Sequence, residues 1–202
     1  MCMDYAGQKT GFYTVIAAVC HQKKGGCMQL AMKVVRLELF YNHAASQRFL
    51  HEIRYLAPFF AEEVEHFCLR LLSLLSLYEF APALAQTAGK GPDLFVKDEH
   101  SHYRLWCQVA VPNDKQLQRA CHQSDQVLLM LPEYEQQKYL QAHKQSANLQ
   151  ICGVSADTLN DFAQMLKSNM QLSVWRDDDV LQITDGQLLL ELAAPPVSST
   201  LH

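Results

Sequence analysis

The sequence lacks the patterns that identify several common classes of protein. No apolar run reaches the length of about 18 residues that a transmembrane helix requires, so we expect no membrane contact. Basic residues are not in excess, because 17 Lys and Arg stand against 21 Asp and Glu and the net charge is −4. Proteins that bind nucleic acid non-specifically usually carry a basic surface, so any such role depends on a local patch. The segment GKGPD lacks the length and the following helix of a phosphate loop, and we expect no small-molecule cofactor.

The seven cysteines form no CxxC pair and are odd in number, which excludes a closed set of disulfides. Several lie inside apolar runs such as EHFCLRLL and LQICGV, which is typical of buried free thiols in a reducing compartment. The spacing of the histidines and cysteines between His100 and His122 matches no closed zinc pattern, so we expect no zinc. These features together predict a cytoplasmic protein.

The first 31 residues differ from the rest of the chain. FYTVIAAVC has the length of a signal-peptide core, but no Ala-x-Ala cleavage site follows it. Secretion therefore stays open as an alternative to a poorly structured leader upstream of a start at Met28 or Met32. We predict a leader at 1–31, one domain at 32–194 and a flexible tail at 195–202.

From Lys33 the hydrophobic pattern becomes regular. Alternation of apolar and polar residues in KVVRLELFY and QRFLHEIRYLAP predicts two strands, and the apolar stripe of AEEVEHFCLRLLSLLSLYEF predicts a helix. Two short strands are expected at about 93–97 and 103–111, and then a helix from Asn113, its N-cap, to about residue 122.

The second half of the chain continues this alternation. QVLLML and LQICGV are apolar throughout, which predicts strands buried on both faces. EYEQQKYLQAHKQ and ADTLNDFAQMLKS predict helices, the second capped by Ser155, and MQLSVW, VLQIT and LLLEL predict a C-terminal antiparallel meander. The whole pattern predicts a single α/β domain with a mixed central sheet flanked by helices.

The stretch GPDLFVKDEHSHYRLWCQVAVPNDKQL follows the plan of a metal-dependent nuclease site. The two-residue period of a strand places Trp106, Gln108 and Ala110 on one face, with Asp93 on the partner strand across from them. Metal-assisted phosphodiester cleavage needs oxygen ligands for Mg²⁺ and a nearby cation. Here a neutral amide stands at the second acidic position and Ala110 at the lysine position. From spacing alone, the simpler interpretation is a hairpin in which Asp93 makes a turn contact.

Four stretches, taken in order, resemble the YaeQ family of small bacterial proteins. They are KVVRLELFY, EEVEHFCLRLLSLL, LWCQVAVPNDKQLQRAC and MQLSVWRDDDVLQITDGQLLLEL, and the resemblance extends from about Met32 to Leu192. The third stretch is the most specific, because the family typically shows Leu-Trp-x-Glu-x-Gly-x-Pro before a charged helix. That family is similar in fold to the PD-(D/E)xK nucleases, so the resemblance implies a nuclease-like fold.

The resemblance also implies which residues form the site. Asp93 takes the position of the family's metal-binding Asp, and Gln108 takes that of its usual Glu. The family lacks the strand lysine, and a basic residue of the next helix replaces it, here Lys115 or Arg119, one helical turn apart. An amide contributes no negative charge, so we expect weak Mg²⁺ binding at most.

Glu62 and Glu65 match acidic positions of the family's first helix, where they would complete the metal site from one side. Compensation of the helix dipole explains these two residues equally well. Two functions stay open. The one we favour is a catalytically impaired binding or regulatory module with a protein or nucleic-acid partner, in which Trp106 is a contact residue or, more simply, a packed one. The alternative is a Mg²⁺-dependent nuclease that uses Asp93, Gln108 and Lys115.

Overall fold

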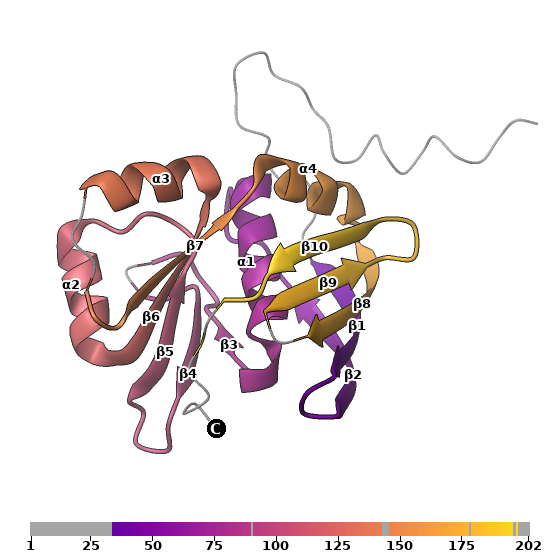
Figure 1. Ribbon diagram of the computed structural model, residues 1–202, viewed down its shortest axis with the longest axis horizontal. Helices are drawn as coiled ribbons and strands as arrows, with labels where there is room; N and C mark the ends of the chain where they lie inside the picture. The colour runs from indigo at the N-terminus through magenta and orange to yellow at the C-terminus, as the bar shows by residue number, and fades with distance from the viewer. Residues whose placement is uncertain (1–33, 90, 143–145, 178, 196, 198–202) are drawn as a thin grey trace, which may run out of the picture.

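The computed structural model describes residues 34–89, 91–142, 146–177, 179–195 and 197. The predicted leader and most of the predicted tail lie outside these residues. The described strands form two five-stranded sheets, in the order β3-β4-β5-β6-β7 and the order β10-β9-β8-β1-β2 (Figure 1). We call them the first and the second sheet.

The first sheet is mixed. Its antiparallel part comprises β3 and β4, and β5, β6 and β7 run parallel to one another. Its strands are β3 (Ala83–Leu84), β4 (Leu94–Lys97), β5 (Tyr103–Gln108), β6 (Ser124–Pro132) and β7 (Leu149–Val154). The strand β6 is central and apolar throughout its second half, as a strand covered on both faces must be.

The second sheet is mixed as well. It pairs β1 in parallel with β8, and its other neighbours are antiparallel. Its strands are β1 (Val35–His43), β2 (Arg48–Leu56), β8 (Asn169–Asp177), β9 (Val180–Thr184) and β10 (Leu189–Ala193). Buried and more exposed residues alternate along β1 and β8, which is the pattern of a sheet with one covered face. The predicted C-terminal meander is confirmed as β8, β9 and β10.

The helices explain why the strands separate into two sheets. Helix α1 (Val64–Ser76) is buried on almost every side and packs in one core with β1 and β8 of the second sheet and with β5 and β6 of the first. Helices α2 (Asp114–Gln123) and α3 (Glu133–Ala142) cover the other face of the first sheet. Helix α4 (Ala156–Met165) packs beside α1, and a 3-10 turn, η2 (Tyr78–Phe80), follows α1.

The predicted fold class, a single mixed α/β domain, is confirmed, but one central sheet becomes two. The reason is α1, whose sequence EHFCLRLLSLLSL leaves no polar face to turn toward water, so a sheet packs on each side of it. The helix caps agree with prediction: Asn113 accepts a hydrogen bond from the Gln116 amide, and Ser155 accepts one from the Thr158 amide.

The four described cysteines are free thiols. Cys68 and Cys107 are buried, and Cys121 and Cys152 are partly buried. Burial raises the pKa of Cys68 to about 12 and that of Cys152 to about 11, so these thiols stay protonated and unreactive at neutral pH.

Candidate functional site

Asp93 lies immediately before β4, where the β4–β5 pair ends. Its amide donates a hydrogen bond to the Cys107 carbonyl oxygen at 2.9 Å, and its carboxylate oxygen Oδ2 accepts one from the Val109 amide at 2.9 Å. Because Leu94 is the register partner of Cys107, the backbone of Asp93 lies across from Gln108. The carboxylate thus makes a contact across two strands in place of the local turn contact that spacing alone suggested.

Gln108 is the last residue of β5 and only 9% of its surface is exposed. It follows Trp106 on the sheet face that α2 and α3 cover. Trp106 is 2% exposed, and its ring lies 5.0 Å from that of Tyr103, which confirms the packed interpretation of this tryptophan. In the part of the chain that the structure describes, the side-chain amide of Gln108 makes no hydrogen bond.

The prediction that β5 continues to residue 111 is wrong, because the strand ends at Gln108. The Val109 amide bonds to the Asp93 carboxylate, which takes the place of a ladder bond. Ala110 is exposed in a bend beyond the strand, so it does not share a strand face with Gln108.

Glu62 is the most fully bonded acid of this region. Its Oε1 accepts a hydrogen bond from Nδ1 of His66 and lies 3.1 Å from Nε of Arg70, and its Oε2 accepts from the Phe59 amide at 2.8 Å. The side chains of Glu62 and Arg70 are 2% and 4% exposed. Arg70 also donates to the Ala57 carbonyl at 3.1 Å and lies 3.7 Å above the Phe59 ring.

This arrangement differs from both explanations of Glu62 that the sequence suggested. Glu62 precedes the N-cap of α1, Glu63, so it is not in the first helical turn. Its two oxygens are already bonded to His66, Arg70 and the Phe59 amide, which leaves little room for a metal ion. Sequence reasoning missed His66 and Arg70, although Glu62, His66 and Arg70 lie four residues apart at each step, a spacing that favours one cluster on a helix.

Burial raises the pKa of Asp93, although the Val109 amide and the positive charges of His66 and Arg70 oppose that shift. Burial also lowers the pKa of Arg70, and the negative charges of Glu62 and Asp93 oppose it. Arginine nonetheless stays charged at neutral pH because its ordinary pKa is so high. The Arg70 guanidinium therefore neutralises one carboxylate of the site from within the fold.

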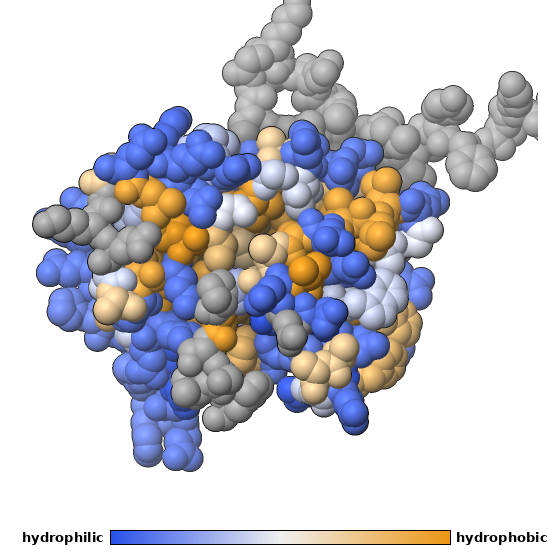
Figure 2. Space-filling model, viewed as in Figure 1, coloured by the Kyte–Doolittle hydropathy of each residue, from blue (hydrophilic) through white to orange (hydrophobic). Residues whose placement is uncertain are grey.

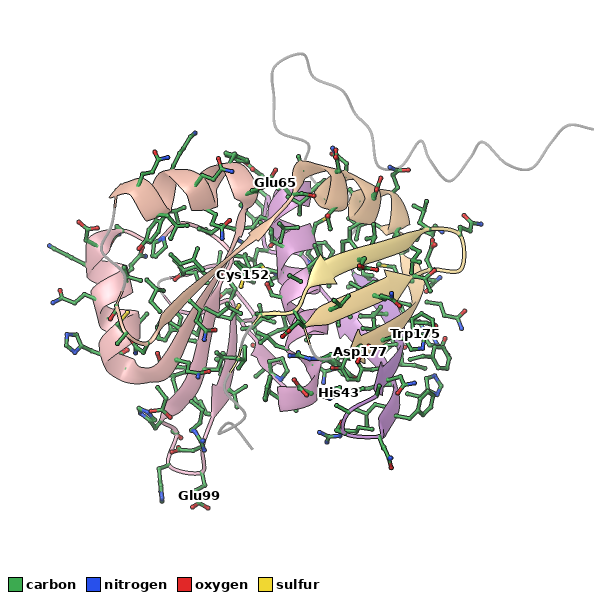
Figure 3. The ribbon with its side chains drawn as sticks, viewed as in Figure 1. His43, Glu65, Glu99, Cys152, Trp175 and Asp177 are labelled. Carbon is green, nitrogen blue, oxygen red and sulfur yellow. The ribbon has the colours of Figure 1, made fainter. Side chains whose placement is uncertain are left out.

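Among the described residues, the remaining predicted ones make no hydrogen bond or ion pair with this cluster. Glu65 is exposed at the N-terminal end of α1 and accepts a hydrogen bond from the Tyr134 hydroxyl at 3.4 Å (Figure 3). Lys115 and Arg119 are exposed on α2, and Arg119 donates to the side-chain oxygen of Gln123 at 3.0 Å. Among the described residues, no hydrogen bond or ion pair joins Lys115 or Arg119 to Asp93.

A small open cavity lies beside the cluster, with a volume of about 160 Å³. The His66 side chain and the segment after β5 reach it. It is lined by Glu63, Glu65, His66, Leu69, Val109, Ala110, Pro132 and Glu135. Three of these side chains are glutamates and none is lysine or arginine, so the cavity repels anions.

The residues of the site do not fit a tight Mg²⁺ centre. Mg²⁺ binds charged oxygen ligands in a strict octahedron, but Gln108 is neutral and Glu62 is already bonded to the side chains of His66 and Arg70. Within the described ranges, no group of three or more His, Cys, Asp or Glu side chains is placed to hold a metal ion. Asp93, at the end of the β4–β5 pair, keeps one carboxylate oxygen, Oδ1, without a hydrogen bond to another described residue.

Comparison with known proteins gives the family. The model of the YaeQ protein family matches residues 28–194. The chain belongs to the YaeQ family. An uncharacterized YaeQ protein of Salmonella typhi is 25% identical over 154 residues, which cover 72% of this chain and 84% of that protein. None of the helices among the described residues is long and apolar enough to cross a membrane.

Two solved YaeQ structures share the fold. The YaeQ protein of Xanthomonas axonopodis pv. citri matches with a TM-score of 0.70 and 18% identity, over 81% of this chain and 96% of that one. The YaeQ protein of Pseudomonas syringae matches with a TM-score of 0.72 and 18% identity, over 83% and 97%. At this identity the likeness shows the fold and leaves the chemistry to the residues themselves.

Proposed function

We propose that this YaeQ-family chain is a binding or regulatory module of the bacterial cytoplasm, built on a PD-(D/E)xK nuclease-like scaffold whose catalysis is lost. The observation that carries the proposal is the bonding of Glu62. Its charge is met by Arg70 inside the fold, so it adds nothing to the attraction of a divalent cation. Gln108 removes a second charge from the same place, and Asp93 alone remains.

A protein partner fits the site better than a nucleic acid. The cavity beside His66 carries Glu63, Glu65 and Glu135, and the whole chain has a net charge of −4. A phosphate backbone that approaches this cavity meets negative charge without a compensating lysine or arginine, which opposes the electrostatic attraction that nucleic-acid binding relies on. A protein partner that presents a lysine or arginine side chain is instead attracted to these three glutamates.

The alternative, a Mg²⁺-dependent nuclease, has one observation in its favour. Asp93 and Gln108 lie across from each other at the ends of β4 and β5, and the Gln108 amide oxygen is free to act as a ligand. The deciding experiment is a cleavage assay with Mg²⁺ and with Mn²⁺ on single-stranded DNA, duplex DNA and RNA. It compares the wild-type chain, Gln108→Glu and Asp93→Asn, with Glu63→Gln as a control for an exposed charge in the same region.

The proposal expects no cleavage by the wild-type chain or by Asp93→Asn. Cleavage that appears only in Gln108→Glu would show that one missing charge separates the scaffold from an enzyme, and it would support the loss of catalysis. Cleavage by the wild-type chain that disappears in Asp93→Asn and persists in Glu63→Gln would overturn the proposal in favour of the nuclease. Calorimetric titration with MgCl₂ gives an independent measurement, for which we expect no saturable heat from the wild-type chain.

A further inference from the structure

The strand β2 is a long open edge of the second sheet. It has nine residues and pairs along its whole length with β1, and no described strand pairs with its other side (Figure 1). The backbone amides and carbonyls on that side have no strand partner among the described residues, so they offer a template for another strand. Natural proteins usually keep edge strands short or protect them, and the length of β2 departs from that practice.

The outer face of β2 is also unusually apolar for a surface. Phe49, Ile53 and Tyr55 are 66%, 44% and 71% exposed, and they share one face of the strand because they lie an even number of residues apart. On the same face, His51 stacks on Phe40 of β1 with ring centroids 4.3 Å apart. None of the helices that the structure describes covers this face, because α1 packs on the opposite side of the sheet.

Three exposed apolar residues lie on β2, and Leu189 of β10, at the opposite edge of the sheet, is 64% exposed. Elsewhere on the outer face of the sheet, Trp175 of β8 is 42% exposed, and it lies on the side of the molecule away from α1 (Figure 3). On the face of the molecule drawn in Figure 2, hydrophobic side chains occur in small groups separated by hydrophilic ones. A contact that covers β2 therefore removes a localised group of aromatic and aliphatic side chains from water.

We propose that a second copy of this chain binds here, with β2 paired antiparallel to β2 of the partner about a twofold axis. The second sheets of the two copies then join into one continuous ten-stranded sheet, and the backbone groups along the two β2 edges pair with each other. A twofold axis perpendicular to the sheet keeps each side chain on its own face, so the residue on the axis faces its own copy. The central residue decides which side chains meet.

With Ile53 on the axis, the side chains of the two strands are complementary. Glu52 lies opposite the partner's Arg54, and symmetry repeats this pair on the other side of the axis. Leu50 lies opposite the partner's Leu56, and His51 opposite the partner's Tyr55. Glu52 and Arg54 already form an ion pair within each strand at 3.0 Å, and this register joins the two ion pairs into one group of alternating charges beside apolar residues.

The neighbouring registers lack this complementarity. With Glu52 on the axis, the two Glu52 carboxylates meet. With His51 on the axis, Arg48 lies opposite the partner's Arg54, and with Arg54 on the axis the two guanidinium groups meet. Like charges directly opposite each other destabilise a strand pair, so the charges of β2 select the register centred on Ile53.

The test uses charge exchange, with the full chain in reducing buffer and its mass measured by sedimentation over a concentration series. The wild-type chain is expected to be a dimer. Glu52→Arg and Arg54→Glu, each alone, place like charges opposite each other at two positions and are expected to weaken the dimer on the order of tenfold or more. An equimolar mixture of the two variants restores both opposite-charge pairs in a mixed dimer, so the mixture is expected to dimerise again.

Two controls keep the result specific. Ile53→Lys places two ammonium groups on the axis from an exposed position and is expected to give monomers without loss of fold, which circular dichroism checks. Leu189→Lys changes a residue that is 64% exposed on β10, at the other edge of the same sheet, and is expected to leave the dimer intact. A monomeric wild type, a dimer that both single variants retain, or a mixture that stays monomeric would each overturn the proposal.

Discussion

The two sheets of this protein have the same number of strands but very different surroundings. The first sheet has helices on both faces, and its central strand β6 reads as an apolar run. The second sheet has α1 and α4 on one face and no described helix on the other, and its strands β1 and β8 alternate between buried and more exposed residues. The candidate site lies at an end of the covered sheet, and the proposed dimer contact lies at the edge of the open one.

Because of this difference, the buried ion pair and the open strand edge lie in separate parts of the molecule. Charged groups such as Glu62 and Arg70 are held by packing between α1 and the segment before it, where water is scarce and an ion pair is strong. The outer face of the second sheet is not covered by a described helix. It therefore has a long edge strand, β2, and exposed aromatic side chains. Substitutions in the covered part are therefore expected to change stability much more than substitutions on the open face.

The largest effect is expected for Leu129→Ala. Leu129 is 0% exposed in the central strand of the first sheet, and its loss leaves a cavity between that sheet and the helices that cover it. We expect a loss of about 3–5 kcal/mol in the free energy of unfolding, measured by urea denaturation. Leu189→Ala in the open sheet, where 64% of the side chain is exposed, is the control and should change it by less than about 0.5 kcal/mol. Equal losses would contradict the contrast between the sheets.

A smaller but still large effect is expected for Glu62→Gln. The substitution leaves the Arg70 guanidinium buried without its paired carboxylate. We expect a loss of about 3 kcal/mol, at the lower end of the range for a broken buried ion pair, because the negative charge of Asp93 remains nearby. Glu63→Gln, at an exposed position one residue along, is the matched control and should change stability by less than about 0.5 kcal/mol. A loss of the same size in both variants would show that the ion pair is not the cause.

The smallest effect, and one of opposite sign, is expected for Asp93→Asn. Burial raises the pKa of Asp93 above the ordinary value of 3.8, so the folded state holds this proton more tightly than the unfolded state does. Ionised Asp93 therefore lowers stability at neutral pH, and the penalty disappears as the pH falls through the raised folded pKa toward the unfolded one. The asparagine oxygen can still accept the Val109 amide. We expect Asp93→Asn to be more stable than the wild type at neutral pH, by a margin that shrinks in acid.

Asp98→Asn provides the contrast in the exposed hairpin between β4 and β5. The His102 amide, which donates to the Asp98 carboxylate, lowers the pKa of Asp98, so its ionised form stabilises the fold. This stability is present above the unfolded pKa and is lost as the pH falls through the folded one. We therefore expect Asp98→Asn to be less stable than the wild type at neutral pH and equal to it in strong acid. Urea denaturation over a pH series measures both variants, and the same sign in both would contradict the assignment.

Local patterns of the sequence predicted most of the elements. Alternation in KVVRLELFY and in the three C-terminal segments led to the correct strands, and the caps Asn113 and Ser155 led to the correct helix starts. These signals succeed because backbone hydrogen bonds and the period of a strand or helix depend on neighbours in the chain. The pairing of Asp93 with the end of β5 was also accessible, because a short hairpin brings its two strands together.

The sequence by itself thus determined the elements, the mixed α/β class and the family. Tertiary structure alone decided that the strands divide into two sheets, that Glu62 is bonded to Arg70, and that β2 is left as an open edge. Each of these depends on contacts between distant segments, above all on α1, which is buried on almost every side and packs against both sheets. Periodicity in the sequence shows which residues are buried, but only the packing of the whole chain decides which segments these residues contact.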